Sequence, residues 1–316
     1  MNDFFDNQRI LDMIWKRKFH FILVGIISIL LSAVFSGPTF ITPKFKSTAR
    51  IYPTNIWIHS NESETEQMLE IVNSRDIKLK MIDAFQLDKV YGINRNDPHY
   101  LTYMLDLYDT NVKTSKTEFE TVEIKVFDVN PQRASDMCDS IIHFYNKKVQ
   151  EFQKILNWEM VVISKDALRD KNQQIDSIST ILDTLKNDYG ILDFNTQTPE
   201  LTRGYMNALA TGRGSAGDTK KIEELYHNFA KEGTKAIRLQ SQLNYLIETA
   251  DSIAAQRDFY FGEYNKEIVY CQVVENPVPA DKKSYPIRWL IVALSTLSVE
   301  FLALLIFLVL EYRKKG

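Results

Sequence analysis

Two apolar stretches, one near each end of the chain, constrain its architecture more than any other feature. The first runs from Phe19 to Phe35 and the second from Trp289 to Leu310. A helix needs roughly 20 apolar residues to cross the hydrocarbon core of a bilayer. The second stretch has this length, and the first reaches it if its helix continues through Ile41. The sequence therefore predicts two transmembrane helices, at residues 19–41 and 287–310, with a large water-soluble part between them.

Positive charges flank both stretches on their terminal sides. Lysine and arginine are enriched at the cytoplasmic ends of spans, and the residues concerned are Lys16, Arg17, Lys18, Arg313, Lys314 and Lys315. Residues 1–18 and 311–316 are therefore predicted to be cytoplasmic tails, and the central part to be exported. A cleavable signal peptide is the alternative for the first stretch, but its apolar run is longer than the roughly 7–15 residues usual there.

Bulk composition excludes some classes of function. Lysine and arginine number 38 against 41 aspartates and glutamates, so the net charge of −3 gives no sign of nucleic-acid binding. The two cysteines, Cys138 and Cys271, are too few for a disulfide framework. We expect them to be buried free thiols.

Two long helices are predicted in the exported part. The chain from Pro131 to Tyr189 has no internal glycine or proline, and Asn130 is placed to cap its start. Heptad spacing holds from Val161 onward, and Gly190 is expected to end the helix. The second helix extends from Ile222 to Tyr264 with the same 3-4 spacing. Its predicted seam includes Leu225, Leu239, Leu243, Leu246 and Ile253.

The segment between these helices, Ile191–Asp218, is predicted to be loop, with a short helix as an alternative for part of it. It contains Pro199, Gly204, Gly212, Gly214 and Gly217, and glycine and proline mark turns and loops. Two long helices joined in this way are expected to form an antiparallel hairpin over residues 131–264, with its tip near residues 191–218.

The remaining exported residues predict a compact base at 44–130, closed by 265–286. Strands are expected at Phe45–Tyr52, at Glu120–Val129, where Val122, Ile124, Val126 and Asp128 share one face, and at Ile268–Val274. Helices are expected at residues 66–74, 75–87 and 98–107. The predicted fold class is thus an α+β membrane protein, with a mixed α/β base and a long antiparallel helical hairpin.

No pattern in the sequence predicts a catalytic site, a metal site or a cofactor site. The five histidines are scattered, without a second histidine or a cysteine at metal-ligand spacing. Gly212-Arg213-Gly214 lacks the lysine and hydroxyl residue that end a phosphate-binding loop. The carboxylates fall mainly on predicted helix surfaces, so an unrecognised carboxylate-pair hydrolase remains only as an alternative.

Glu300 lies near the middle of the second apolar stretch, where a charged group is costly and is expected to face protein or water. It shares a helical stripe with Ala293, Thr296 and Ala303. The first stretch has a matching stripe of small residues, Gly25, Ser28, Ser32 and Ser36. Small residues allow helices to approach closely. We therefore predict a packing contact in which Ser28 or Ser32, of the same or a neighbouring subunit, bonds Glu300. Contact with a membrane partner and a proton relay are the alternatives.

Four segments carry a resemblance to a known family. They are Phe45-Lys-Ser-Thr-Ala-Arg-Ile-Tyr52, Leu69-Glu-Ile-Val-Asn-Ser-Arg-Asp76, Thr121-Val-Glu-Ile-Lys-Val-Phe-Asp-Val-Asn-Pro131 followed by Ala134, and the proline-rich Asn276–Pro286 with Pro277, Pro279 and Pro286. Together with the two spans they resemble the chain-length determinant, or Wzz-type polysaccharide co-polymerase, family. Because no kinase domain follows the second span, the chain is similar to the short, kinase-free kind.

The resemblance implies a non-enzymatic bacterial inner-membrane protein. Such a protein forms a ring-shaped homo-oligomer beside a glycan polymerase and regulates the length of a surface polysaccharide made on undecaprenyl-linked intermediates. The polysaccharide would be an O-antigen, a capsule or an exopolysaccharide. Two alternatives remain: a regulatory subunit of a separate cytoplasmic tyrosine kinase, and a periplasmic adaptor of a secretion system.

Overall fold

A computed structural model describes residues 7–56, 61–211 and 216–313. The chain forms two compact units. The first contains the residues up to Val149 together with those from Val269 onward, and the second contains Gln150–Ile268. The predicted flanking charges Lys314 and Lys315 and the Gly212-Arg213-Gly214 segment lie outside the described residues.

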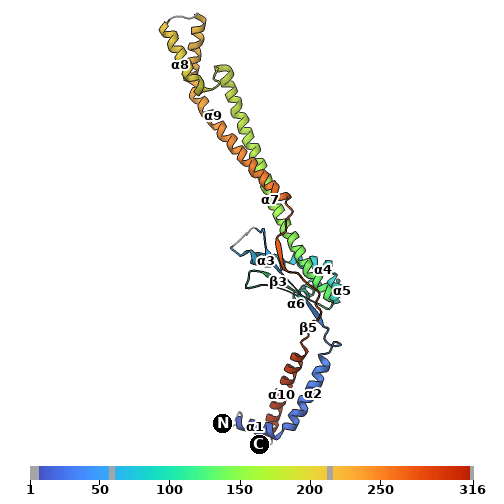
Figure 1. Ribbon diagram of the computed structural model, residues 1–316. Coiled ribbons are helices and arrows are strands. Elements are labelled where there is room, and N and C mark those ends of the chain that lie inside the picture. The colour runs from blue at the N-terminus through green and yellow to red at the C-terminus, as the bar shows by residue number, and fades with distance from the viewer. Residues whose placement is uncertain (1–6, 57–60, 212–215, 314–316) are drawn as a thin grey trace. The chain divides into compact units, whose positions relative to one another are not determined.

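An antiparallel sheet of five strands organises the base in the first unit (Figure 1). Its central strand, β1 (Lys44–Pro53), pairs with β3 (Val122–Asp128), β4 (Cys271–Glu275) and β5 (Lys283–Tyr285), and β2 (Val112–Lys116) pairs with β3. The predicted strands at 45–52, 120–129 and 268–274 are confirmed. The short strands β2 and β5 were not predicted.

One face of the sheet forms the core of the base. Ala49, Ile51, Val122, Ile124 and Val126 are fully buried, and burial alternates strictly along β3. This confirms the predicted face of that strand. Helices α3 (Glu64–Val72) and α6 (Tyr100–Asn111) pack on the sheet, and α4 (Arg75–Ala84) and α5 (Leu87–Tyr91) pack on α6. The other face of the sheet, with Arg50 and Tyr52, remains exposed.

The long helix α7 (Pro131–Tyr189) starts as the sequence predicts. Asn130 Oδ1 accepts the backbone N–H of Gln132 at 2.9 Å and of Arg133 at 3.3 Å, which caps the first turn. Asp128 precedes the cap at the end of β3, and Arg133 binds both of its carboxylate oxygens, at 2.9 and 2.6 Å. Strand, cap and helix are therefore joined by one local network.

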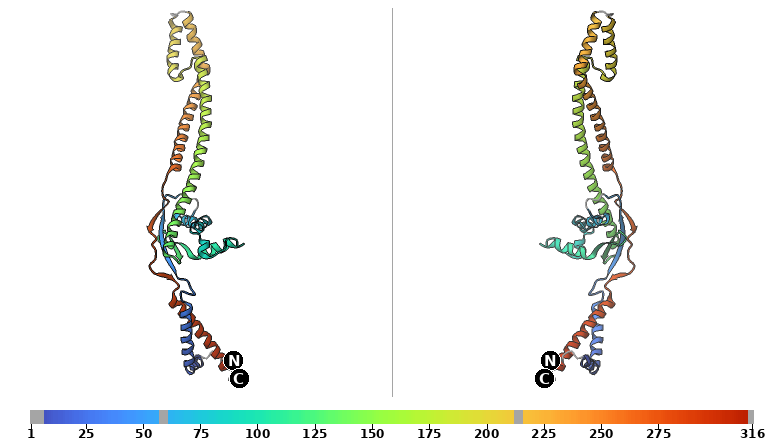
Figure 2. Two further views of the ribbon diagram at one scale, coloured as in Figure 1. Left: turned by 90° about the vertical axis from the view of Figure 1, so that its right-hand side faces the viewer. Right: turned by 90° about the vertical axis from the view of Figure 1, so that its left-hand side faces the viewer.

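In the second unit, α7 and α9 (Ala216–Asn265) lie side by side and antiparallel (Figure 2). Leu185, near the end of α7, packs in a cluster with Phe229 and Ala236 of α9. Trp158 of α7 meets Tyr264, near the end of α9, with ring centroids 5.2 Å apart. The predicted helical hairpin is confirmed. Gly190 ends α7 with a positive φ of 69°, and its N–H bonds the carbonyl of Lys186.

The prediction of loop between the two long helices was wrong for most of that segment. Residues Phe194–Thr211 form helix α8, which packs on α9. The rings of Tyr205 and Tyr226 stack with centroids 4.4 Å apart, and those of Phe194 and Phe229 at 5.6 Å. Pro199 and Gly204 both have a low helix propensity, and a glycine in a helix costs roughly 1 kcal/mol relative to alanine. The packing of α8 on α9 outweighs this cost.

Among the residues that the structure describes, two helices are long and apolar enough to cross a membrane, α2 (Lys18–Phe35) and α10 (Arg288–Arg313). They lie side by side (Figures 1 and 2). The expected continuation of the first helix through Ile41 was wrong. The helix ends at Phe35 because Pro38 has no N–H to donate and disfavours helical backbone in Gly37 before it. The predicted tail at 1–18 also contains a helix, α1 (Asn7–Lys16), which packs against α2 and α10.

Candidate functional site

The contact between α2 and α10 brings together most of the residues that the sequence singled out in the apolar stretches. The helices are antiparallel, because Phe21 near the start of α2 meets Phe307 near the end of α10, with ring centroids 5.2 Å apart. Gly25 lies next to Glu300. A methyl group at position 25 would lie 2.6 Å from Glu300 Oε1, so the absence of a side chain at Gly25 makes room for the carboxylate.

Within the described part of one chain, neither predicted serine bonds Glu300, and a bond to Ser28 or Ser32 of a neighbouring subunit stays a prediction. Ser28 is buried, but its Oγ has no hydrogen-bond partner. Ser32 instead bonds Ser295, with 2.6 Å between the two hydroxyl oxygens. A long side chain reaches beyond the depth of its own Cα, so the depth of residue 300 alone does not identify what its carboxylate contacts.

The predicted stripe on α10 is only partly at the contact. Ala303 is buried and Thr296 is half-buried, but Ala293 is exposed and lies outside the contact. Ser295 takes part in its place. A stripe through Ile291, Ser295 and Val299 was equally consistent with the sequence, since residues three or four apart share one face of a helix.

An apolar hollow of about 410 Å³ lies along the same helix pair. Ile27, Leu31, Phe35, Ile291 and Val299 supply most of its apolar lining, and Ser28 and Ser32 border it. A surface of this composition suits hydrocarbon and offers no acid–base or nucleophilic chemistry.

The predicted seam of the hairpin is the buried face of α9. Leu246 is buried, and Leu225, Leu239, Leu243 and Ile253 are half-buried, while most residues between them are exposed. Leu239 packs against the cluster of Leu185 and Phe229. The heptad spacing therefore places each of these side chains against the rest of the hairpin.

Gly233 has a packing role that the sequence did not reveal. A methyl group at this position would lie 1.8 Å from Cε2 of Phe194, so α8 and α9 approach each other through the missing side chain. Glycine in a helix interior usually costs stability relative to alanine, but here it allows the ring of Phe194 to stack on Phe229.

The proline-rich segment lies along the base. Pro277 and Pro286 are buried and Pro279 is exposed. Between Pro277 and Pro279, the carbonyl of Val278 accepts a hydrogen bond from Ser47 Oγ at 3.0 Å, and β5 then pairs with β1. The segment thus holds the chain against the central strand before α10 begins.

The described residues give no sign of metal chemistry, since no three of their histidine, cysteine, aspartate or glutamate side chains are grouped to hold an ion. Cys138 and Cys271 are buried free thiols, as expected. Burial raises the pKa of the Cys138 thiol to about 12, which makes it a poor nucleophile at neutral pH.

A known protein family matches the N-terminal part of the chain. Residues 3–85, which include α2, β1, α3 and α4, match the family model of the chain length determinant protein, Wzz. Over these residues the chain is similar to chain length determinant proteins. The resembling segments at 45–52 and 69–76 lie inside the matched range, and those at 121–134 and 276–286 lie outside it.

Three of the solved structures that the chain resembles are distant from it in sequence. A full-length bacterial polysaccharide co-polymerase has 13% identity and a TM-score of 0.47, over 96% of this chain and 97% of the other. The O-antigen chain-length regulator WzzBSF of Shigella flexneri has 12% identity and a TM-score of 0.35, over 76% and 100%. A WzzB fragment from Salmonella Typhimurium has 13% identity and a TM-score of 0.20, over 77% and 100%. No curated protein sequence matches the chain.

Proposed function

We propose that this protein is a non-enzymatic co-polymerase that regulates the chain length of a bacterial surface polysaccharide. The observation that carries the proposal is the Wzz family match over residues 3–85. The helical hairpin and the two apolar helices support it, since these are the parts that the family resemblance implies. The glycan is an O-antigen, a capsule or an exopolysaccharide made on undecaprenyl-linked intermediates.

The proposed location is the inner membrane, crossed by α2 and α10, with the base and hairpin in the periplasm. The antiparallel contact of the two helices supports a two-pass arrangement, because it brings the start of α2 and the end of α10 to the same side. Arg17 and Lys18 at that end are typical of a cytoplasmic flank.

Labelling of single introduced cysteines with a membrane-impermeant maleimide tests this topology. Trp15→Cys on α1 and Tyr245→Cys on α9 place thiols at positions that are 73% and 67% exposed. In spheroplasts, Tyr245→Cys should be labelled at once and Trp15→Cys only after lysis. The unsubstituted protein is the control, because its two buried thiols should stay unlabelled. Labelling of Trp15→Cys in intact spheroplasts would contradict the proposed orientation.

Further copies of the same chain and a membrane-embedded glycan polymerase are the proposed partners. A ring-shaped homo-oligomer would place many hairpins side by side around the growing glycan. Mass photometry of the protein in detergent measures this assembly, and a purely monomeric species would argue against it.

Deletion of the gene should leave glycan synthesis intact and abolish control of glycan length. We expect the narrow size distribution on gels to become broad, because a regulator without catalytic residues is dispensable for polymerisation itself. Complementation with the wild-type gene should restore the distribution, while the vector alone should not. An unchanged ladder in the deletion strain would refute the proposed function.

A further inference from the structure

The exposed face of the base sheet carries a hollow of about 470 Å³ that none of the functions above uses. Arg50 and Tyr52 of β1, Glu123 of β3 and Val274 of β4 line it, together with Lys116 and Phe119 at the β2–β3 turn. Its volume falls within the range of roughly 300–1,000 Å³ that is usual for small-ligand pockets. The strands meet there from both ends of the exported part of the chain.

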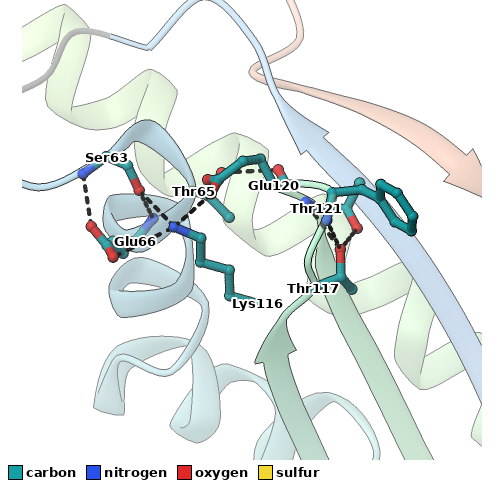
Figure 3. Close-up of polar contacts among 8 residues, drawn as sticks. Ser63, Thr65, Glu66, Lys116, Thr117, Glu120 and Thr121 are labelled. Atoms are coloured by element: carbon teal, nitrogen blue, oxygen red, sulfur yellow. Dashed lines mark hydrogen bonds and ion pairs between the residues drawn. The ribbon is translucent and has the colours of Figure 1, made fainter.

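The turn beside the hollow is held in place by a dense set of polar contacts (Figure 3). Thr65 donates to the carbonyl of Glu120 at 2.9 Å, which ties the turn to the start of α3. Lys116 Nζ lies 2.9 Å from a carboxylate oxygen of Glu120 and 3.5 Å from one of Glu66. Thr117 and Thr121 close the turn, since the N–H of Thr117 bonds the carbonyl of Thr121 at 2.8 Å.

This anchored turn presents a large aromatic side chain to solvent. Phe119 is 78% exposed, and Tyr52 on the neighbouring strand is also exposed. Exposed aromatic rings on a fixed backbone offer flat apolar faces at a low cost in conformational entropy. The ring of Phe119 is therefore available to a ligand that has an apolar face of its own.

Charged groups surround these rings and are balanced in sign. Arg50 lies between Glu123, at 3.1 Å, and Glu275, at 3.5 Å, and both Arg50 and Glu275 are about half exposed. Hydrogen bonds from Lys125 and then Arg50 lower the pKa of Glu123, so its carboxylate is ionised at neutral pH. The hollow thus offers both strong hydrogen-bond donors and strong acceptors. Its two cations, Arg50 and Lys116, are equal in number to its two carboxylates, Glu118 and Glu123.

We propose that this hollow binds a short stretch of neutral glycan. A pyranose ring has a face of C–H groups that stacks on an aromatic ring and a rim of hydroxyls that both donate and accept hydrogen bonds, which matches Phe119, Tyr52 and the Arg50–Glu123 pair. A protein partner fits less well, because the centres of protein interfaces are depleted in lysine and glutamate. The inference rests on the proposed function, which brings glycan to this part of the chain.

Isothermal titration of the full-length protein in nanodiscs tests the inference. The probe is the delipidated surface polysaccharide of the source strain, cut to oligosaccharides, and dextran of the same size is the control ligand. The wild-type protein should bind the oligosaccharides and not dextran. Phe119→Ala and Arg50→Ala should each weaken binding about tenfold, because each removes one side of the proposed contact.

Tyr245→Ala is the matched control variant, since Tyr245 is an exposed aromatic residue on α9, outside the base. It should bind as the wild type does. Absence of binding to the wild-type protein, or unchanged binding by Phe119→Ala, would overturn the inference. A change in the oligomer mass of Phe119→Ala with unchanged glycan binding would also overturn the inference. That result would assign this face of the sheet to contact between subunits.

The two proposals fail separately. If the deletion strain loses length control but the wild-type protein binds no oligosaccharide, the proposed function stands and the glycan site does not. If oligosaccharide binds and Phe119→Ala weakens it but the deletion leaves glycan length unchanged, the site stands and the proposed function fails.

Discussion

Leu246→Asp is expected to unfold much of the helical hairpin. The same substitution at the next residue, Ile247→Asp, should have little effect on stability. Leu246 is only 5% exposed and lies on the seam of α9, while Ile247 is 41% exposed. An unpaired carboxylate in such a seam is deprived of water and has no compensating charge. Removing the partner of a buried charge typically costs 3–5 kcal/mol, and we expect a loss of roughly this size.

Hydrogen exchange of the α9 amides is the suitable measurement, because it reports the stability of one part of a chain with two units. Protection should fall strongly along α9 in Leu246→Asp, with the β3 amides as an internal reference. The same substitution at Ile247 controls for the added charge and the altered helix propensity. Equal loss of protection in both variants would contradict the seam.

Arg133→Ala should destabilise the base about as strongly as Leu246→Asp destabilises the hairpin. The side chain of Asp128 is 1% exposed, and Arg133 Nη2 lies 2.6 Å from its Oδ1. Among the described residues, removing the guanidinium leaves the N–H of Asn130, at 2.7 Å, as the remaining hydrogen-bond donor to this buried carboxylate. We expect a loss of roughly 3–5 kcal/mol, measured as reduced amide protection in β3 and a lower melting temperature.

Arg169→Ala provides the control on the same helix. Arg169 pairs with Asp166 at 3.3 Å on an open surface, where such pairs contribute about 0–1 kcal/mol. Adding Asp128→Asn to Arg133→Ala should recover part of the loss, because it removes the buried charge. If Arg133→Ala costs no more than Arg169→Ala, the buried pair does not stabilise the base.

Elements that depend on local periodicity were predictable from the sequence. The alternation along Val122–Asp128, the cap at Asn130 and the heptads on α9 each express a geometry that neighbouring residues impose on one another. The apolar helices belong to the same group, since length and composition alone decide whether a helix can cross a bilayer. The helix α8 was missed for the opposite reason, because its stability comes from Phe229 and Tyr226 on another helix.

Contacts between residues far apart in the chain were decided only by the tertiary structure. The sequence could place Glu300 on a helix but not against Gly25, because the relative rotation and depth of two helices depend on all the side chains between them. It gave no hint that Gly233 makes room for Phe194, or that β2 and β5 complete the sheet. The hollow beside Phe119 is the clearest case, since Arg50, Glu123 and Val274 meet there only through strand pairing. By itself, the sequence determined the periodic helices and strands and the two apolar helices, whose causes are local. Long-range packing determined the geometry of every candidate site.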